Sequence, residues 1–234
     1  MFSFQTKVSY SRVNRKGIVP YYEVVNYLQD CSTFHADELG HGVDYKNAQK
    51  KAWVLISYKI QMIKPISYGQ EIEVGTSPTS FRKLFASRQF YIKDMEGNYL
   101  VKADSLWILM DLESRKTVRI AEEDMQGYQL ETLFKDVEAS RKIKLSQERN
   151  QYRPFQVLAT YIDSNCHMNN ADYLRAVEEF LEDTQRYQQL EIVYHKEAVE
   201  DETIIPFLHP EDNGVGISFE NKSGELLTEI RFTN

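Results

Sequence analysis

Residues 19–31 read VPYYEVVNYLQDC, and this stretch decides the fold of the first half of the chain. Its apolar side chains recur at steps of three and four residues, the spacing of one face of an α-helix. They are Tyr21, Val24, Val25, Leu28 and Cys31. Pro20 suits a first helical turn, and glycines at 40 and 42 suit the end. We therefore predict a helix from about residue 19 to 39.

The apolar pattern changes to a period of two after this helix, which is typical of half-buried strands. The alternating residues are Val54, Ile56, Tyr58, Ile60 and Met62. Further strands are predicted at about 70–77, 84–93 and 99–111, with a hairpin turn at 94–98.

The second half repeats this plan. A strand is predicted at 156–161 and a helix at about 169–185, followed by period-two residues at 190–194. The last three strands are expected at about 202–208, 214–220 and 224–232.

A long apolar helix beside an antiparallel sheet must bury its apolar face against that sheet. Two such units in tandem can pair their sheets and share a cleft. We therefore predict an α+β fold of the tandem (double) hot-dog type, in which each unit is a long helix wrapped by an antiparallel sheet. Residues 1–120 would form the N-terminal unit, the charged residues 121–150 a linker with a helical piece, and 151–234 the C-terminal unit.

The composition is that of an ordinary globular protein, with 42% hydrophobic and 27% charged residues among 234. A net charge of -7 argues against a general role in nucleic-acid binding. The two cysteines, Cys31 and Cys166, make no disulfide framework and favour a cytoplasmic location. No signal peptide is recognised at 1–7, and no apolar run is long enough to predict a membrane span.

The most informative motif for function is DSNCHMNNADY at residues 163–173. It places a carboxylate, an amide and an imidazole at alternating positions just before a predicted helix, whose first N–H groups can stabilise negative charge. Acyl hydrolysis needs such a set: a base or nucleophile, a positioned water and donors for an oxyanion. Asp163, Asn165 and His167 are therefore the candidate catalytic residues.

Each of these residues also has a structural interpretation, because Asp and Asn cap helices and form turns. The corresponding turn of the first half, VNRKGIVP at residues 13–20, has no Asp, no His and no paired Asn. A purely structural need for the motif should show in both halves, so the asymmetry favours chemistry at one site. Cys166 lies between the polar positions and is expected to point away from them. Asn170 and Tyr173 are expected to support or pack.

Several segments spread over nearly the whole chain resemble the plant-type acyl-ACP thioesterase family. They are SY at 9–10, VNYLQD at 25–30, AWVL at 52–55, YGQEIEV at 68–74, ADSLWILM at 103–110, the motif D-x-N-x-H-x-N-N-x-x-Y at 163–173 and YHKEA at 194–198. The resemblance implies hydrolysis of the thioester between a fatty acyl chain and acyl carrier protein (ACP), with no cofactor or metal. It also implies that Asp163, Asn165, His167 and Glu197 are catalytic. Some members have Cys where this chain has Ala198, so a cysteine nucleophile there is excluded and a water- or carboxylate-based mechanism remains.

The expected roles follow from the chemistry of the four residues. Asp163 and His167 would form the acid–base centre, with either one taking the proton. Glu197 would hold the water or the imidazole, and Asn165 would position the thioester oxygen or the water. The first half would serve as a wall of the acyl pocket. Its large aromatic residues are mainly expected in the core, although some must line the acyl tunnel: Trp53, Tyr58, Phe90 and Trp107.

ACP is acidic and this chain is acidic too, so docking would need a local cationic patch. One candidate is residues 141–144 with Arg149 and Arg153, and another is Arg82, Lys83 and Arg88. Ordinary solvated charge is the alternative for both. The chain is expected to be a monomer or a weak homodimer, because a pseudo-dimer needs no partner to complete its site.

Four other functions are alternatives for this sequence. An acyl-CoA thioesterase would share the fold and the chemistry. A dehydratase or hydratase fits the Asn-x-His-x-Asn-Asn turn less well, and a non-catalytic acyl-binding protein leaves the one-sided polar cluster unexplained. A metal enzyme is weakest, because no second His lies near His167 in a ligand-like pattern.

Overall fold

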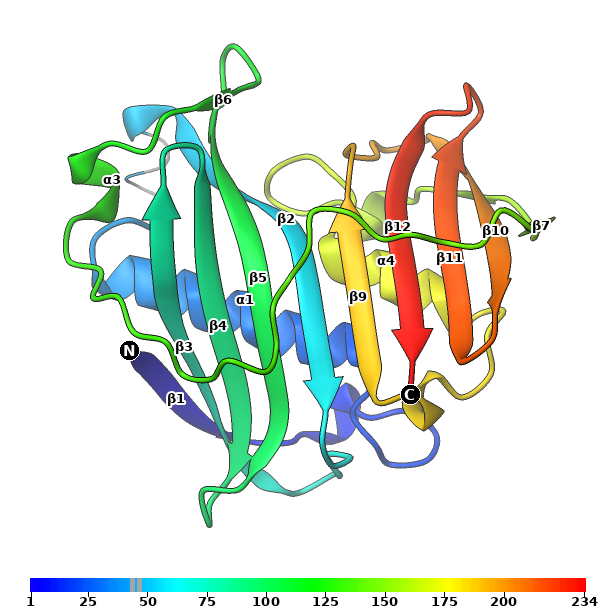
Figure 1. The fold of residues 1–234 in the computed structure, drawn as a ribbon, viewed down its shortest axis with the longest axis horizontal. Coiled ribbons are helices and arrows are strands. Elements are labelled where there is room, and N and C mark those ends of the chain that lie inside the picture. The colour runs from blue at the N-terminus through cyan, green and yellow to red at the C-terminus, as the bar shows by residue number, and fades with distance from the viewer. Residues whose placement is uncertain (43–44, 46–47) are drawn as a thin grey trace.

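The computed structural model describes residues 1–42, 45 and 48–234. Its centre is one 12-stranded sheet to which both halves contribute (Figure 1). The main path of strands runs β1-β3-β4-β5-β2-β9-β12-β11-β10-β7, with antiparallel neighbours. The first half supplies β1 (Phe2–Lys7), β2 (Lys51–Met62), β3 (Glu71–Arg82), β4 (Phe85–Asp94), β5 (Tyr99–Asp111) and β6 (Lys116–Val118). The second supplies β7 (Asn150–Gln151), β8 (Phe155–Gln156), β9 (Gln189–Tyr194), β10 (Thr203–Glu211), β11 (Gly214–Asn221) and β12 (Leu226–Thr233).

The predicted period-two strands are confirmed, and several are longer than expected. The strand predicted at 156–161 is wrong for most of its length. Strand β8 ends at Gln156, and a 3-10 turn follows at Ala159–Tyr161. Strand β1 was not predicted; it pairs with β3 and covers that edge of the sheet.

The two halves meet where β2 pairs with β9. Tyr58 lies opposite Ile192 and Ile60 opposite Leu190, and all four side chains are fully buried. Because these residues belong to one continuous apolar core, the two halves share both a sheet and a core.

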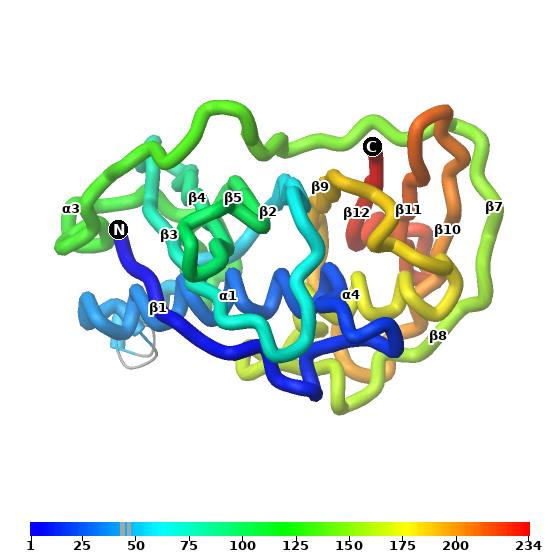
Figure 2. The backbone as a smooth tube through the Cα atoms, turned by 90° about the horizontal axis from the view of Figure 1, so that it is seen from below, coloured from blue at the N-terminus to red at the C-terminus, as the bar shows by residue number. Residues whose placement is uncertain are grey.

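Both long helices lie on the same face of the sheet, roughly end to end (Figures 1 and 2). Helix α1 (Tyr21–Glu38) matches its prediction, and it buries its apolar side against the sheet. The helix predicted at 169–185 is wrong in length, because α4 spans only Asn170–Val177. Residues 178–183 carry four acidic side chains, which the negative end of a helix dipole disfavours, and Asp183 adopts a left-handed φ of 58°.

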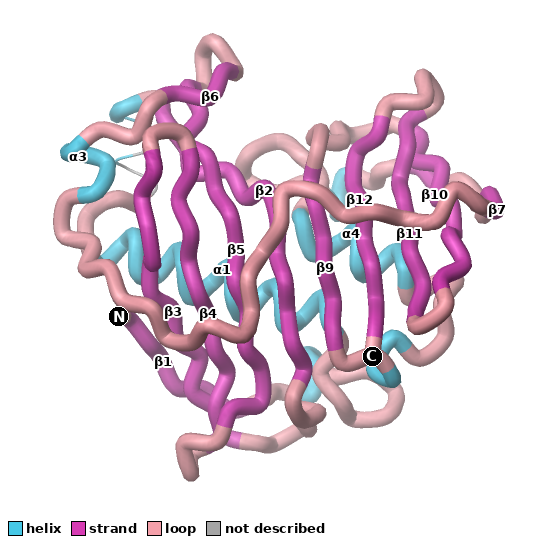
Figure 3. The backbone as a smooth tube through the Cα atoms, viewed as in Figure 1, coloured by secondary structure: helices cyan, strands magenta, loops and turns pink. Residues whose placement is uncertain are grey.

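Residues 121–149 cross the opposite face of the sheet (Figures 2 and 3) and are called the strap below. The strap contains α3 (Glu122–Met125), the predicted helical piece. Sheet side chains hold it: Gln89 Oε1 accepts the N–H of Leu133 at 2.8 Å, and Asp104 Oδ2 accepts that of Ala139 at 2.8 Å. The division of the chain at residues 120 and 151 stays a prediction.

None of the helices in the described ranges is both long enough and apolar enough to cross a membrane.

Candidate active site

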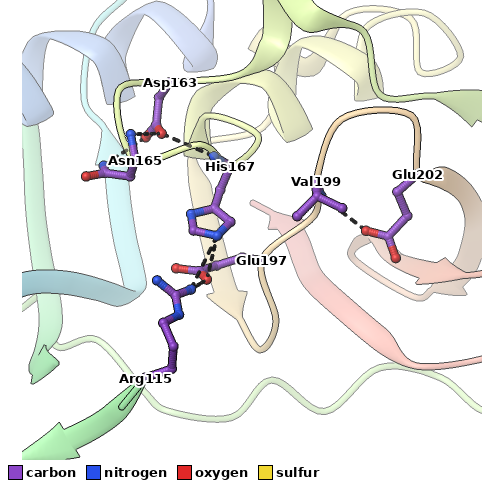
Figure 4. Close-up of polar contacts among 7 residues, drawn as sticks. All are labelled: Arg115, Asp163, Asn165, His167, Glu197, Val199 and Glu202. Carbon is purple, nitrogen blue, oxygen red and sulfur yellow. Dashed lines mark hydrogen bonds and ion pairs between the residues drawn. The ribbon is translucent and has the colours of Figure 1, made fainter. Parts of the chain in front are cut away.

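The motif at 163–173 forms a tight turn that leads into α4. Asp163 N–H donates to the carbonyl of His167 at 2.8 Å, and Asp163 O accepts the N–H of Cys166 at 3.0 Å. The carboxylate reinforces the turn: Oδ1 accepts the N–H of Asn165 at 2.7 Å, and Oδ2 accepts from Asn165 Nδ2 at 3.1 Å (Figure 4). Cys166 takes a left-handed φ of 65° and is exposed. Asp163 therefore has a structural role, whatever its chemistry.

The first half builds the same turn with different side chains. Asn14 Oδ1 accepts the N–H groups of Lys16 at 2.9 Å and Ile18 at 3.2 Å, and Asn14 O accepts the N–H of Gly17. Gly17 has a left-handed φ of 73°, as Cys166 does in the second half. The side-chain acceptor is thus a structural requirement of both turns. The expectation that a structural need would repeat the motif itself needs correction, because an uncharged Asn meets that need.

The two turns differ at His167, which has the apolar Ile18 as its counterpart in the first half. His167 Nε2 lies 3.1 Å from Glu197 Oε2 (Figure 4). The structure thus brings His167 and Glu197 together, as the resemblance implied. Asp163 and Asn165 contact each other on the other side of the turn.

Arg115 completes this cluster and was not predicted from the sequence. Its Nη2 lies 3.3 Å from His167 Nε2 and forms an ion pair with Glu197 Oε2. Arg115 comes from the β5–β6 hairpin of the first half, where it has a left-handed φ of 56°. No local pattern marks it, because it lies 52 residues from His167 in the sequence.

Burial lowers the pKa of His167, the Arg115 guanidinium lowers it further, and Asp163 acts in the opposite direction. The ring is therefore neutral near pH 7 and can accept a proton. Its Nε2 donates to Glu197 in one tautomer or accepts from Arg115 in the other, but cannot do both. Glu197 is placed to compensate the charge when the ring becomes an imidazolium.

The start of α4 lies beside the same cavity, which Asn169 and Asn170 line. Most N–H groups there are occupied: Met168 donates to Ala198 O at 2.9 Å, and Ala171 donates to the N-cap side chain of Asn169 at 2.9 Å. Within the described part of the chain, the N–H of Asn170 has no acceptor. It lies in the first turn of the helix, where an unpaired N–H can bind a negative oxygen.

A cavity of about 810 Å³ connects these groups. Asp163, Asn165, His167 and Glu197 all line it, together with Asn170. From there it extends between α1 and the sheet of the first half. Its wall includes Gln29, Thr33 and Ala36 on α1, and Trp53, Leu55, Phe81, Trp107 and Leu109 on the strands. Of the four predicted aromatic residues, Trp53 and Trp107 are thus cavity residues, whereas Tyr58 and Phe90 are fully buried in the core.

Arg88 also lines this cavity and is 9% exposed. Its Nη1 donates to Thr76 Oγ1 at 3.2 Å and lies 3.0 Å from His35 Nδ1. The predicted cationic patch of Arg82, Lys83 and Arg88 is therefore wrong as a group. Arg82 and Lys83 are exposed in the β3–β4 hairpin, but Arg88 is inside the protein.

No group of three or more His, Cys, Asp or Glu residues in the described ranges is arranged to hold a metal ion.

Fold and site together define a double hot-dog protein in which His167 and Glu197 of the second half meet Arg115 of the first half in one polar cluster. The chain belongs to the acyl-ACP thioesterase family. The model of the family's N-terminal domain matches residues 1–128, and that of its C-terminal domain matches residues 144–231.

Known relatives and structures are similar over most of this chain. A chloroplastic acyl-[acyl-carrier-protein] hydrolase of Cuphea viscosissima is 25% identical over 222 residues, covering 85% of this chain and 53% of the relative. A chloroplastic palmitoyl-acyl carrier protein thioesterase of Arabidopsis thaliana is 24% identical over 198 residues, covering 77% and 48%. The chain thus spans about half the length of the curated relatives it matches.

Two solved structures confirm the fold. An acyl-ACP thioesterase from Bacteroides thetaiotaomicron superposes with a TM-score of 0.89 at 20% identity, covering 99% of this chain and 96% of that one. The 12:0-ACP thioesterase from Umbellularia californica gives a TM-score of 0.81 at 17% identity, with 99% and 96% covered. The predicted tandem hot-dog architecture is therefore correct.

Proposed function

We propose that this protein hydrolyses the thioester between a fatty acyl chain and ACP, releasing free fatty acid and ACP. The observation that carries the proposal is the 3.1 Å contact of His167 with Glu197 in a cavity that is also lined by Asn170, whose backbone N–H has no acceptor within the described residues. A base and an oxyanion donor are the two components that a thioester needs, because its thiolate already leaves well.

In the proposed reaction the oxygen of a water molecule attacks the carbonyl carbon, and its proton passes to the imidazole of His167 or to the carboxylate of Asp163, which both line the cavity. The carbonyl oxygen becomes negative and is held by the N–H of Asn170. When the tetrahedral intermediate collapses, the C–S bond breaks and the departing thiolate takes the proton back. Glu197 stabilises the charged imidazole, and Asn165 orients the water or the thioester oxygen.

The acyl chain would occupy the part of the cavity between α1 and the first-half sheet. Ala36 lines this part about two helical turns beyond Gln29, which is roughly 10 Å further from α4. Trp53, Leu55 and Leu109 provide the apolar wall on the sheet side. This supports a slot that begins at the polar cluster and continues into the first half.

ACP is the proposed carrier because the relatives' names specify it and because the chain belongs to their family. Exposed cations remain on the β3–β4 hairpin (Arg82, Lys83) and on the strap (Arg141, Lys142, Lys144) as docking candidates. Arg149 is less available, since it forms an ion pair with Glu220. Action in the cytoplasm by a monomer or weak dimer belongs to the same proposal.

The test is release of fatty acid from matched acyl-ACP and acyl-CoA substrates over a series of chain lengths. The proposal expects a higher kcat/KM with the ACP substrates, and a loss of that advantage at high salt because docking is electrostatic. Equal or better hydrolysis of acyl-CoA would assign the chemistry to a different carrier. Tight acyl binding without release would identify a binding protein.

A further inference from the structure

Gln29 connects the two halves of the protein at the candidate active site. It lies on α1 in the first half, and its side-chain amide reaches the start of α4 in the second. Nε2 donates to Asn169 Oδ1 at 3.4 Å, and Oε1 accepts from Asn170 Nδ2 at 3.1 Å. One amide thus bonds the side chains of both Asn169 and Asn170, and the proposed chemistry gives these two side chains no role of their own.

These contacts fix the first residues of α4 from several sides. Asn169 Oδ1 also accepts the N–H of Ala171 at 2.9 Å, which caps the helix. The carbonyl of Asn170 accepts from the hydroxyl of Tyr194 at 3.0 Å. Gln29 therefore holds the side chain of Asn170 while Tyr194 holds its carbonyl. The unpaired N–H of Asn170 belongs to the same residue, so its direction depends on both contacts.

We propose that Gln29 is a positioning residue, which aims the N–H of Asn170 at the oxygen of the bound thioester. This inference rests on the proposed function, because the oxyanion forms only if thioester hydrolysis occurs. An amide is suited to the task because it presents one donor to Asn169 and one acceptor to Asn170. A leucine offers neither, and an ionised glutamate offers only acceptors.

The first half is then more than a wall of the acyl pocket. It contributes Gln29 to the donor side of the site and Arg115 to the base side. The site of the second half is incomplete without both contacts. The sequence separation of 140 residues between Gln29 and Asn169 explains why no local motif reveals the connection.

The test compares Gln29→Leu and Gln29→Glu with wild type in the full-length chain, using one acyl-ACP substrate. Gln29→Leu should lower kcat about 10- to 100-fold, as expected for a misplaced reacting group, with KM changed by less than about threefold. Glu38→Leu is the matched control, since Glu38 is an exposed α1 residue outside the cavity. It should retain wild-type kcat.

The Gln29→Glu variant tests the positioning role through the pH dependence of kcat, which a purely structural role of Gln29 would leave unchanged. At pH 8 the ionised carboxylate of the Gln29→Glu variant cannot donate to Asn169, so this variant should be as slow as Gln29→Leu. As the pH falls towards 5, protonation of the new carboxylate restores a donor. The ratio of its kcat to that of wild type at the same pH should therefore rise severalfold, whereas that of Gln29→Leu should stay flat.

The inference is overturned if folded Gln29→Leu keeps kcat within twofold of wild type, or if the two variants show the same pH-independent ratio. Either result leaves the proposed function intact, because wild-type turnover is measured in the same experiment. Absence of wild-type turnover would instead overturn the proposed function, and this role with it.

Discussion

At the scale of single residues, Asp163 has a structural task in its turn beside the chemical task proposed for it. Its carboxylate accepts the N–H of Asn165, and Asn14 makes the equivalent contact in the first half with an uncharged amide. The turn needs an acceptor and does not need a charge. The charge of Asp163 is therefore available to the chemistry.

This comparison predicts the behaviour of Asp163→Asn. The amide can still accept the turn N–H, so the free energy of unfolding should stay within about 0.5 kcal/mol of wild type. Loss of the carboxylate from the acid–base centre should lower kcat by about 100-fold or more. Asp163→Ala should in addition lower the free energy of unfolding by about 1 kcal/mol, because it removes the side-chain acceptor of the turn N–H. Thermal unfolding and fatty-acid release measure both effects; a fully active Asp163→Asn variant would remove Asp163 from the centre.

Arg115 leads to a pH prediction. It helps to lower the pKa of His167, so Arg115→Met should raise that pKa. His167 would then be protonated at higher pH, and the acid limb of the kcat/KM profile should move to higher pH. Lys116→Met, which removes an exposed neighbouring cation, should leave the limb in place. If the acid limb of Arg115→Met stays at the wild-type pH or moves to lower pH, Arg115 does not lower the pKa of His167.

At the scale of secondary-structure elements, α1 forms one wall of the proposed acyl slot. Ala36 lines the cavity about two turns beyond Gln29. Ala36→Phe should fill this part of the slot and lower kcat/KM for long acyl chains at least about tenfold more than for short ones. Glu38→Phe adds the same ring on an exposed position and should leave the profile unchanged. An unaltered chain-length profile in Ala36→Phe would place the acyl chain elsewhere.

The strap provides a second prediction at this scale. Burial raises the pKa of Asp104 to about 6 from its ordinary 3.8, against the hydrogen bond from Ala139. The folded state thus binds this proton more tightly than the unfolded state, and stability falls as the pH rises from about 4 to 6. Asp104→Asn keeps an acceptor for Ala139 and removes the charge. The free energy of unfolding of this variant should exceed that of wild type by about 1–3 kcal/mol above pH 6, and it should no longer fall between pH 4 and 6.

Denaturant unfolding at pH 4 and pH 7 would measure the gain. Asp136→Asn is the control, because Asp136 is an exposed strap carboxylate whose pKa the Lys102 ammonium lowers. It should not gain stability at pH 7. Equal behaviour of the two variants would mean that the buried charge of Asp104 carries no cost.

The sequence predicted most elements because their apolar periods are local properties. The error at α4 is instructive, because Phe180 and Leu181 continue the helical period beyond Val177. Both side chains pack against the core although their backbone lies in the turns after α4. Their burial therefore explains the apolar period without a longer helix. The acidic residues at 178–183 were the sign in the sequence of an earlier helix end.

At the scale of the whole molecule, the two halves are joined through one sheet, one core and one candidate site. The pairing of β2 with β9 continues the sheet, and Tyr21 of the first half donates to the carbonyl of Tyr187 in the second at 2.8 Å. The motif in the second half predicted His167 and its neighbours. Arg115 and Gln29 could not be predicted, because only the packing of the two halves brings them to that motif.

The proposed function depends above all on His167 as part of the acid–base centre of a thioester hydrolase. The most direct measurement is the rate of fatty-acid release from a purified acyl-ACP by wild type and by folded His167→Ala. We expect turnover by wild type and a loss of about 100-fold or more in the variant, with little change in its thermal unfolding. Turnover that survives in His167→Ala, or no turnover by wild type, would contradict this expectation.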